Sequence, residues 1–272
     1  MITCNIIGGL GNQLFQIFAT ISYALKHKQV FCFTYKTMTG KRSMYWDNFL
    51  STLKLFTNPI MLTNVQIVDE PLYYSVVPNN QHNIMLTGYF QNPAYFKEYY
   101  KSICRMIRLD AQKQEIKEIM QDIDFNNSIS MHFRQGDYLL LPDHYKILTT
   151  DYYKNSLNHI LKERRDNEAC QVLYFCEDGD LPQVIDIIKQ LKEVYPLVEF
   201  IRAPCDLEDW QQLLMMCCCQ HNIIANSTFS WWSAYFNSNP EKIVCSPAQW
   251  FGPKINIKMA DLLPKEWTTI AI

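Results

Sequence analysis

The second half of the chain alternates short apolar runs with longer stretches in which apolar residues recur every three or four positions. The short runs predict buried strands, and the longer periodic stretches predict amphipathic helices. The predicted strands are 128–131, 171–176, 198–201, 222–225 and 242–246, and the predicted helices are 152–165, 181–194 and about 207–219. Asp151 is the expected cap of the first of these helices. A regular β-α repeat of this kind predicts a parallel sheet with right-handed crossovers.

The first half is a looser version of the same pattern. Strands are predicted at 2–7, 30–35 and 84–88, and helices from about residue 12 to 25 and at 94–108 and 110–121. Residues 36–80 are irregular and polar, with a weak helix near 49–55. The polar break 122–127 is the expected boundary between domains 1–125 and 126–272. The fold class is therefore α/β, with two Rossmann-like halves whose parallel sheets face a cleft.

Three of the eight glycines lie within Gly8-Gly9-Leu10-Gly11, between the first strand and the first helix. Asn12 is the expected N-cap of that helix, and Ser22 is the one polar exception in its apolar stripe. A glycine loop that opens a helix can bind an anion through its backbone N–H groups, or it can simply make a tight turn. The loop does not have the GxGxxG pattern of dinucleotide-binding proteins.

The composition is that of a globular protein, with 19% charged and 48% apolar residues in 272. A net charge of −2 argues against broad nucleic-acid binding. The ten cysteines include no CxxC pair, so we expect buried thiols in a reducing compartment; Cys217–Cys219 with His221 is interpreted as core packing. The N-terminus lacks a basic region and no run approaches a membrane span, so we expect a soluble, cytoplasmic protein without stable membrane insertion.

The central strand 128–131 runs into His132-Phe133-Arg134-Gln135-Gly136-Asp137. Ligands bind at the carboxyl ends of strands in α/β folds, and arginine presents a planar fork of donors that suits phosphate. This stretch therefore predicts a diphosphate site. A second polar strand end, Asn226–Ser230, can hold phosphate oxygens; a Ser/Thr cap would explain one of its hydroxyl groups but not all four polar residues. Trp231 and Trp232 are expected to be core residues.

Two short acidic pieces, Asp122-Ile123-Asp124 and Asp178-Gly179-Asp180, have the DxD spacing with which some sugar transferases hold a divalent cation. Such short patterns also occur by chance, and Asp180 can simply cap the following helix. The favoured interpretation is that no metal is needed, since Arg134 and the hydroxyl groups can offset the charge of a diphosphate.

Three motifs together resemble the α-1,2-fucosyltransferases of glycosyltransferase family 11. They are Gly8–Gln16, His132–Tyr138 and Ile223–Trp232. Further matches lie at Gly88–Gln91, Asp151–Tyr153, Ser246–Phe251 and Asp261–Trp267, and all seven are collinear with the family. The resemblance implies a GT-B fold, GDP-β-L-fucose as donor, a galactose-terminated glycan as acceptor, inversion at C1, and neither a metal nor another cofactor.

The resemblance also implies roles for individual residues. Arg134 would hold the β-phosphate, His132 would contact the nucleoside, and Asn12 would lie near the leaving oxygen. Asp209 is the nearest acidic candidate for guanine or ribose. The implied donor-binding set is Gly11, Asn12, Gln13, His132, Arg134, Asn226, Ser227, Thr228, Phe229 and Asp209.

The general base stays open among Asp137, Asp143 and His144, and a reaction in which the departing phosphate takes the proton would need none of them. The catalytic set is thus Arg134 and Asn12, with Asp137 and His144 as candidates. Family members commonly carry a second arginine where this chain has Gln135, so donor affinity or specificity could differ. We expect Gln135→Arg to leave activity intact or raise it.

Two other hypotheses stay open. The chain could transfer another sugar, or act on another acceptor, or it could be a non-catalytic protein that binds glycans or nucleotides. Residues 36–80 are expected to help select the acceptor. The oligomeric state does not follow from the sequence.

Overall fold

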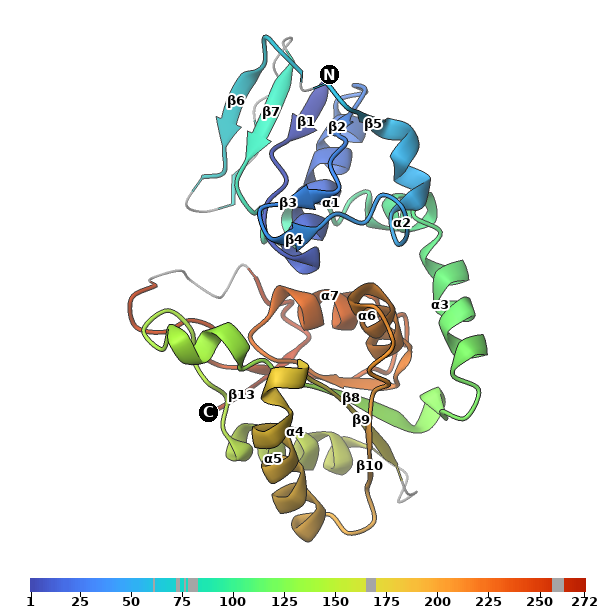
Figure 1. The fold of residues 1–272 in the computed structure, drawn as a ribbon, viewed down its shortest axis with the longest axis vertical. Helices are drawn as coiled ribbons and strands as arrows, with labels where there is room; N and C mark the ends of the chain where they lie inside the picture. The colour runs from blue at the N-terminus through green and yellow to red at the C-terminus, as the bar shows by residue number, and fades with distance from the viewer. Residues whose placement is uncertain (61, 72–73, 76, 78–82, 165–169, 256–261) are drawn as a thin grey trace. The chain divides into compact units, whose positions relative to one another are not determined.

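The computed structural model describes residues 1–60, 62–71, 74–75, 77, 83–164, 170–255 and 262–272. The chain forms two compact units, residues 1–112 with 260–264 and residues 113–259 with 265–272 (Figure 1). The division falls inside helix α3, Leu109–Ile119, and not at the predicted boundary 125/126. The physical reason is Lys113, whose ammonium donates to the Phe236 carbonyl at 3.3 Å and to Ser238 Oγ at 2.9 Å. These bonds tie the last two turns of α3 to the second unit.

The second unit is built on a six-stranded sheet in the order β10-β9-β8-β11-β12-β13, and every neighbouring pair is parallel. Its strands are β8 Ser128–His132, β9 Gln171–Phe175, β10 Glu199–Arg202, β11 His221–Ile223, β12 Val244–Pro247 and β13 Thr268–Ile270. Its helices are α4 Thr150–Glu163, α5 Leu181–Val194, α6 Asp209–Cys218 and α7 Thr228–Phe236. The predicted parallel β-α repeat is confirmed, and β13 is an additional edge strand.

The apolar stripes predicted for α4 and α5 form one core against the sheet. Tyr152, Leu157 and Ile188 are buried there with Ile129 and Val172 of the central strands. Helix α4 begins differently from the prediction. Its N-cap is Thr149, whose backbone is extended, and Asp151 lies inside the first turn, where a negative charge still favours the helix dipole.

The first unit contains a three-stranded parallel sheet in the order β1-β7-β6, next to helix α1. Its strands are β1 Ile2–Cys4, β2 Phe33–Thr34, β3 Met38–Thr39, β4 Arg42–Ser43, β5 Thr57–Asn58, β6 Gln66–Asp69 and β7 Ile84–Thr87. Its helices are α1 Leu10–Lys26 and α2 Tyr100–Met106, with 3-10 turns η1 Ser51–Phe56 and η2 Pro93–Tyr95. The α/β fold with parallel sheets in two Rossmann-like units, as in the GT-B type, is confirmed.

The region 36–80 contains more structure than its sequence predicts. Strand β6 lies within it and pairs with β7, although three of its four residues are exposed, so no apolar run marks it. Strands β3 and β4 form a short antiparallel pair. The weak helix predicted near 49–55 is the 3-10 turn η1. Residues 61, 72–73, 76 and 78–80 of this region lie outside the described residues. The same holds for Asp261 in the last motif and for Arg165 at the end of a predicted helix.

Candidate functional site

The central strand of the second unit, β8, ends at His132, and the predicted phosphate loop follows directly. Arg134 lies in this loop with its side chain 16% exposed, and its guanidinium forms an ion pair with Glu177 from the loop after β9. The guanidinium also lies 5.3 Å from the ring centroid of Tyr138. Arg134 is thus held between a carboxylate and an aromatic ring. The Glu177 side chain is 51% exposed, so an anionic ligand can reach the pair from solvent.

The backbone of the same loop is fixed by Asp180, which is only 3% exposed. Its carboxylate accepts the N–H of Gln135 at 3.0 Å and the N–H of Gly136 at 2.7 Å. Asp180 occupies the N-cap position of α5, as the alternative interpretation of its spacing allows, but its side chain makes no cap bond to the helix. Asp178 pairs with Arg202 at 2.5 Å. The two carboxylates of this DxD piece therefore hold protein groups, which also weakens the metal interpretation.

His132 is buried against the start of α7. Its ring centroid lies 5.5 Å from that of Phe229, and its Nδ1 atom is buried with no hydrogen-bond partner among the residues described. Burial lowers the pKa of His132 to about 3, and the charge of Arg134 adds to the effect. The imidazole is therefore neutral at physiological pH. A neutral ring with an unused nitrogen suits the predicted contact with a nucleoside.

The second predicted phosphate segment forms the N-terminus of α7. Ser227 is the N-cap, and its hydroxyl accepts the Phe229 N–H at 3.3 Å. Asn226 is fully buried, and its amide donates to the carbonyls of Lys146 and Trp250, both at 2.8 Å. Asn226 therefore shapes the loop from behind, whereas Thr228 and Phe229 are half-buried at the positive end of the helix.

Tyr138 joins the two segments, because its hydroxyl donates to the Asn226 carbonyl at 3.1 Å. The structure thus brings His132, Arg134 and the start of α7 into one cluster at the carboxyl ends of β8 and β11. Buried Trp231 and Trp232 lie behind it as core residues, as expected. We call this set the donor cluster; its members are His132, Arg134, Tyr138, Glu177, Asp180 and Asn226–Phe229.

The three candidate bases differ in what surrounds them. Asp143 pairs with Lys254 at 2.6 Å, and this contact lowers the pKa of the carboxyl. His144 is half-buried, with a buried Nδ1 atom that has no partner among the described residues. Asp137 lies in the 3-10 turn η4, Gly136–Leu140, and its side chain is outside what the structure describes. The ion pair makes Asp143 a weaker base than an unpaired carboxylate, since its charged form is already stabilised.

Asp209 is the first residue of α6, exposed, with its carboxylate accepting the Trp210 N–H at 2.7 Å. Glu208 and Gln211 close this helix start as a capping box. The contact of Asp209 with guanine or ribose stays a prediction.

In the first unit the glycine loop leads into α1, whose N-cap is Gly9 and not Asn12. Gly8 has φ +84°, and a side chain there would meet Asn12 Nδ2 at 2.7 Å, so the tight-turn interpretation holds at this position. Asn12 lies inside the first turn of α1, and its Oδ1 atom accepts from Gln91 Nε2 at 2.9 Å. Gln13 is fully buried and donates to the carbonyls of Gly8 and Ser43, and Gly11 is buried as well. Gly11 and Gln13 thus support the loop from inside.

The loop after β7, Gly88–Gln91, is held by Glu70 at the end of β6. The Glu70 carboxylate accepts the N–H groups of Tyr89 and Phe90, each at 2.7 Å. Burial raises the pKa of Glu70, and the bonds from the backbone oppose that rise. Glu70 therefore positions Gln91, which contacts Asn12.

Residues 1–271 match the family described as Glycosyl transferase family 11. The chain belongs to this family. Two relatives from Escherichia coli are each 24% identical: an alpha-1,2-colitosyltransferase, with 99% of both chains covered, and the O-antigen biosynthesis glycosyltransferase WbnK, with 90% of this chain and 93% of the relative covered. The resemblance inferred from the motifs is confirmed, and the protein is a glycosyltransferase.

Solved structures that are similar to this family 11 chain include two with low sequence identity. The R284K mutant of Arabidopsis thaliana FUT1 in complex with GDP is 10% identical, covers 89% of this chain and 69% of its own, and has a TM-score of 0.48. A glycosyl transferase family 9 protein from Veillonella parvula is 11% identical, covers 100% and 85%, and also has a TM-score of 0.48.

The sequence of this family 11 chain does not predict the contacts of three carboxylates. Glu70 binds the loop after β7, and Glu177 and Asp180 bind the loop after β8. Only Asp180 stands in a recognisable pattern, the DxD spacing, and that pattern suggests a metal ligand or a helix cap and not a contact with a loop. Within the described ranges, no helix is long and apolar enough to cross a membrane. Among the same residues, no group of three or more His, Cys, Asp or Glu side chains is arranged to hold a metal ion.

Proposed function

We propose that this glycosyltransferase moves L-fucose from GDP-β-L-fucose to the 2-hydroxyl of a galactose-type residue in a glycan, with inversion at C1. The main supporting observation is the donor cluster, in which Tyr138 lies against the Arg134 guanidinium and donates to the segment that opens α7. A guanidinium and a helix N-terminus are two groups that bind phosphate oxygens well. Together they support a nucleoside diphosphate as the donor's leaving group.

The Arg134–Glu177 pair supports a defined role for the arginine. Glu177 holds the guanidinium with one negative charge, whereas a diphosphate brings more charge and more acceptor oxygens. Donor binding would therefore replace Glu177 as the partner of Arg134. As the bond from C1 to the diphosphate breaks, negative charge grows on the leaving oxygen, and Arg134 stabilises it more strongly than in the ground state. This charge compensation requires no metal ion.

His132 fits the nucleoside side of this arrangement. It follows Met131 in β8, is neutral, and has a buried nitrogen available. Asn12, in the first unit, would lie near the leaving oxygen, where its amide can donate a hydrogen bond. The proton of the acceptor hydroxyl would go to His144 or Asp137, or to an oxygen of the departing phosphate.

A second candidate donor has specific support. One relative is an alpha-1,2-colitosyltransferase that matches almost end to end, so a nucleotide-activated colitose is the main alternative to GDP-fucose. The α-1,2 linkage in its name agrees with the linkage proposed here. The other relative acts in O-antigen biosynthesis, which supports an oligosaccharide acceptor.

The test is a transfer assay with GDP-fucose and lactose, lacto-N-biose or N-acetyllactosamine, with and without EDTA. A donor panel that includes GDP-colitose and other GDP-sugars runs in parallel. We expect fucose on the 2-hydroxyl of galactose, seen by NMR of the product, with equal rates in EDTA. Transfer of colitose alone would replace fucose by colitose as the sugar of the donor. Loss of activity in EDTA would show that the reaction needs a metal ion. No transfer from any donor would contradict the proposal.

A further inference from the structure

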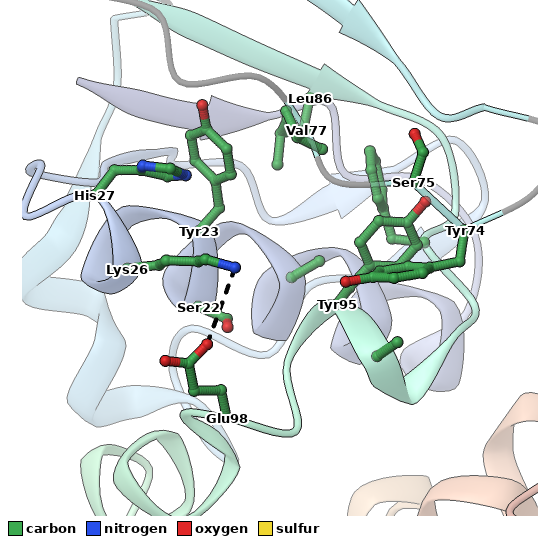
Figure 2. A pocket seen from close by; sticks show the side chains of 13 residues that line it. Ser22, Tyr23, Lys26, His27, Tyr74, Ser75, Val77, Leu86, Tyr95 and Glu98 are labelled. Atoms are coloured by element: carbon green, nitrogen blue, oxygen red, sulfur yellow. Dashed lines mark ion pairs between the residues drawn. The ribbon is translucent and has the colours of Figure 1, made fainter.

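The first unit contains a pocket that the proposed reaction does not use. Figure 2 shows it beside the C-terminal half of α1, with β7 and the turn η2 forming the other walls. It is a shallow hollow that opens to solvent, and its empty space reaches about 480 Å³ only when the solvent above it is included. A ligand as large as a sugar ring would therefore lie over the hollow and against its walls. Its lining includes Ser22, Lys26 and Glu98 on one side and Tyr74 and Tyr95 on the other.

One wall of the pocket is aromatic. The rings of Tyr74 and Tyr95 meet edge to face with their centroids 4.9 Å apart, and Phe90 packs against Tyr95 at 5.1 Å. Tyr74 is 41% exposed, so its ring is available to a ligand. A tyrosine combines an apolar face with a polar hydroxyl. A sugar ring has the matching character, with apolar C–H faces and a polar edge.

The opposite wall is polar. Lys26 and Glu98 face each other at 4.0 Å, which is an ion pair but too long for a hydrogen bond (Figure 2). An ammonium beside a carboxylate offers donors and acceptors side by side, as neighbouring sugar hydroxyls require. Ser22, the polar exception in the α1 stripe, is buried in this wall. A wall with one charge of each sign suits an uncharged polyol better than a phosphate.

His27 adds a further polar group to this wall. Its Nε2 atom is buried and has no hydrogen-bond partner among the residues described. Burial lowers the pKa of His27, and the Lys26 charge adds to the effect, so the ring favours its neutral form. A neutral imidazole can accept or donate a hydrogen bond to a hydroxyl.

The pocket is connected to the loop that carries Asn12. Phe90, in the aromatic wall, is followed by Gln91, whose amide donates to Asn12 at 2.9 Å. Along α1, the pocket begins at Ala19, about 10 Å from Asn12 at the rise of an α-helix. We propose that the pocket is a second carbohydrate subsite, which holds an uncharged sugar ring of the acceptor glycan beyond the galactose that receives fucose. The inference rests on the proposed function.

The test compares acceptors of two lengths that end in the same galactose, a disaccharide and a tetrasaccharide. The variants are Tyr74→Ala and Glu98→Gln, with Leu55→Ala as an exposed control in the same unit. Loss of one aromatic contact worth about 1 kcal/mol should raise KM for the tetrasaccharide roughly fivefold. The disaccharide KM and kcat should stay those of the wild type, as should all values for the control.

A binding measurement without donor gives a second readout. In saturation-transfer NMR, the wild type should transfer magnetisation to sugars of the tetrasaccharide distant from the galactose, and Tyr74→Ala should abolish this signal. Unchanged KM values in both variants, with no signal from the distant sugars in the wild type, would overturn the subsite. Transfer to the disaccharide would then still uphold the proposed function. If no galactoside receives fucose, the proposed function and this acceptor subsite fall together.

Discussion

In each unit, a carboxylate that follows one strand holds the loop that follows the neighbouring parallel strand. In the first unit, Glu70 comes directly after β6 and accepts two N–H groups from the loop after β7. In the second unit, Asp180 follows β9 and accepts two N–H groups from the loop after β8. Both loops therefore have their backbone fixed before any ligand binds, which favours a preorganised site.

Each loop also needs a glycine at the point where the carboxylates approach. Gly88 has φ +140°, and a side chain there would meet Glu70 Cβ at 2.4 Å. Gly136 has φ +23°, and a side chain there would meet Glu177 Oε2 at 2.8 Å. At Gly88 the residue that excludes a Cβ atom is the same Glu70 that binds the backbone. At Gly136 it is Glu177, the partner of Arg134, whereas Asp180 Oδ1 would lie 3.8 Å from the added atom.

The two loops differ in the side chains they present. The loop after β8 carries Arg134, a cation whose partner Glu177 is half exposed and replaceable. The loop after β7 carries Gln91, an amide paired with the amide of Asn12. The two loops are thus held in the same way but present different side chains. The guanidinium of Arg134 suits a diphosphate, whereas the amide of Gln91 suits a neutral hydroxyl compound.

The largest effect is expected from Arg134→Ala. Loss of a charge contact that strengthens in the transition state should reduce kcat/KM at least about 100-fold, or roughly 2.7 kcal/mol. The matched control is Arg202→Ala, which breaks the ion pair with Asp178 in the same unit and should change the rate less than about twofold. A purely glycan-binding protein would keep its glycan affinity in Arg134→Ala, so measuring both quantities separates enzyme from lectin.

The next largest effects are expected from the two carboxylates that hold the loops, Asp180 and Glu70. Asp180→Ala leaves two backbone N–H groups without their acceptor in a buried site, which should cost about 2–4 kcal/mol of unfolding free energy. The donor KM should rise, because Arg134 follows the loop. Glu70→Ala should destabilise the protein but raise the KM of the acceptor instead. Steady-state kinetics and thermal melting measure both, and a rise in donor KM for Glu70→Ala would break the comparison of the two loops.

His132 gives a pH dependence of stability. Its folded pKa of about 3 lies below the unfolded value near 6.5, so the unfolded chain takes up the proton first as the pH falls. The contribution of the neutral His132 ring to the free energy of unfolding is complete above pH 6.5. It is lost progressively down to pH 3, with roughly 2 kcal/mol gone by pH 5. His132→Gln should flatten this part of the stability profile relative to the wild type, with His159→Gln as control. Identical profiles for the wild type and His132→Gln would show that the ring is not held neutral.

The smallest effect is expected from Glu177→Gln. Without the competing carboxylate, Arg134 should bind the donor somewhat more tightly, and donor KM should fall by about twofold to fivefold, or less than about 1 kcal/mol. The turnover number should stay within about twofold. If donor KM rises instead, Glu177 orients Arg134 for the donor and does not compete with it.

The sequence predicts the parallel sheet of the second unit well, because buried strands and amphipathic helices both leave strong patterns there. It predicts the first unit less well, since β6 is short and exposed and marked by pairing alone. The helix starts were misassigned at Asn12 and Asp151 because both have good capping side chains. The backbone actually turns at Gly9 and Thr149.

Within the site, local patterns identify the residues that follow the strands, such as His132, Arg134 and Ser227. Local patterns do not identify the residues that hold these loops in place. Glu70 follows β6 and Glu177 follows β9, and each reaches a loop only because its strand pairs with the strand before that loop. Gln135 also gains a structural context, since it is buried and its N–H is bound by Asp180. The expectation that Gln135→Arg keeps or raises activity stays a prediction.

The most direct measurement of the central claim is calorimetric titration of GDP into the wild type, Arg134→Ala and the control Arg202→Ala. It isolates binding of the diphosphate from acceptor choice and from chemistry. If the donor cluster binds the diphosphate through Arg134, the affinity of Arg134→Ala for GDP should fall at least tenfold, which is about 1.4 kcal/mol, while Arg202→Ala matches the wild type. Equal affinity of all three proteins for GDP would contradict the placement of the donor at this cluster.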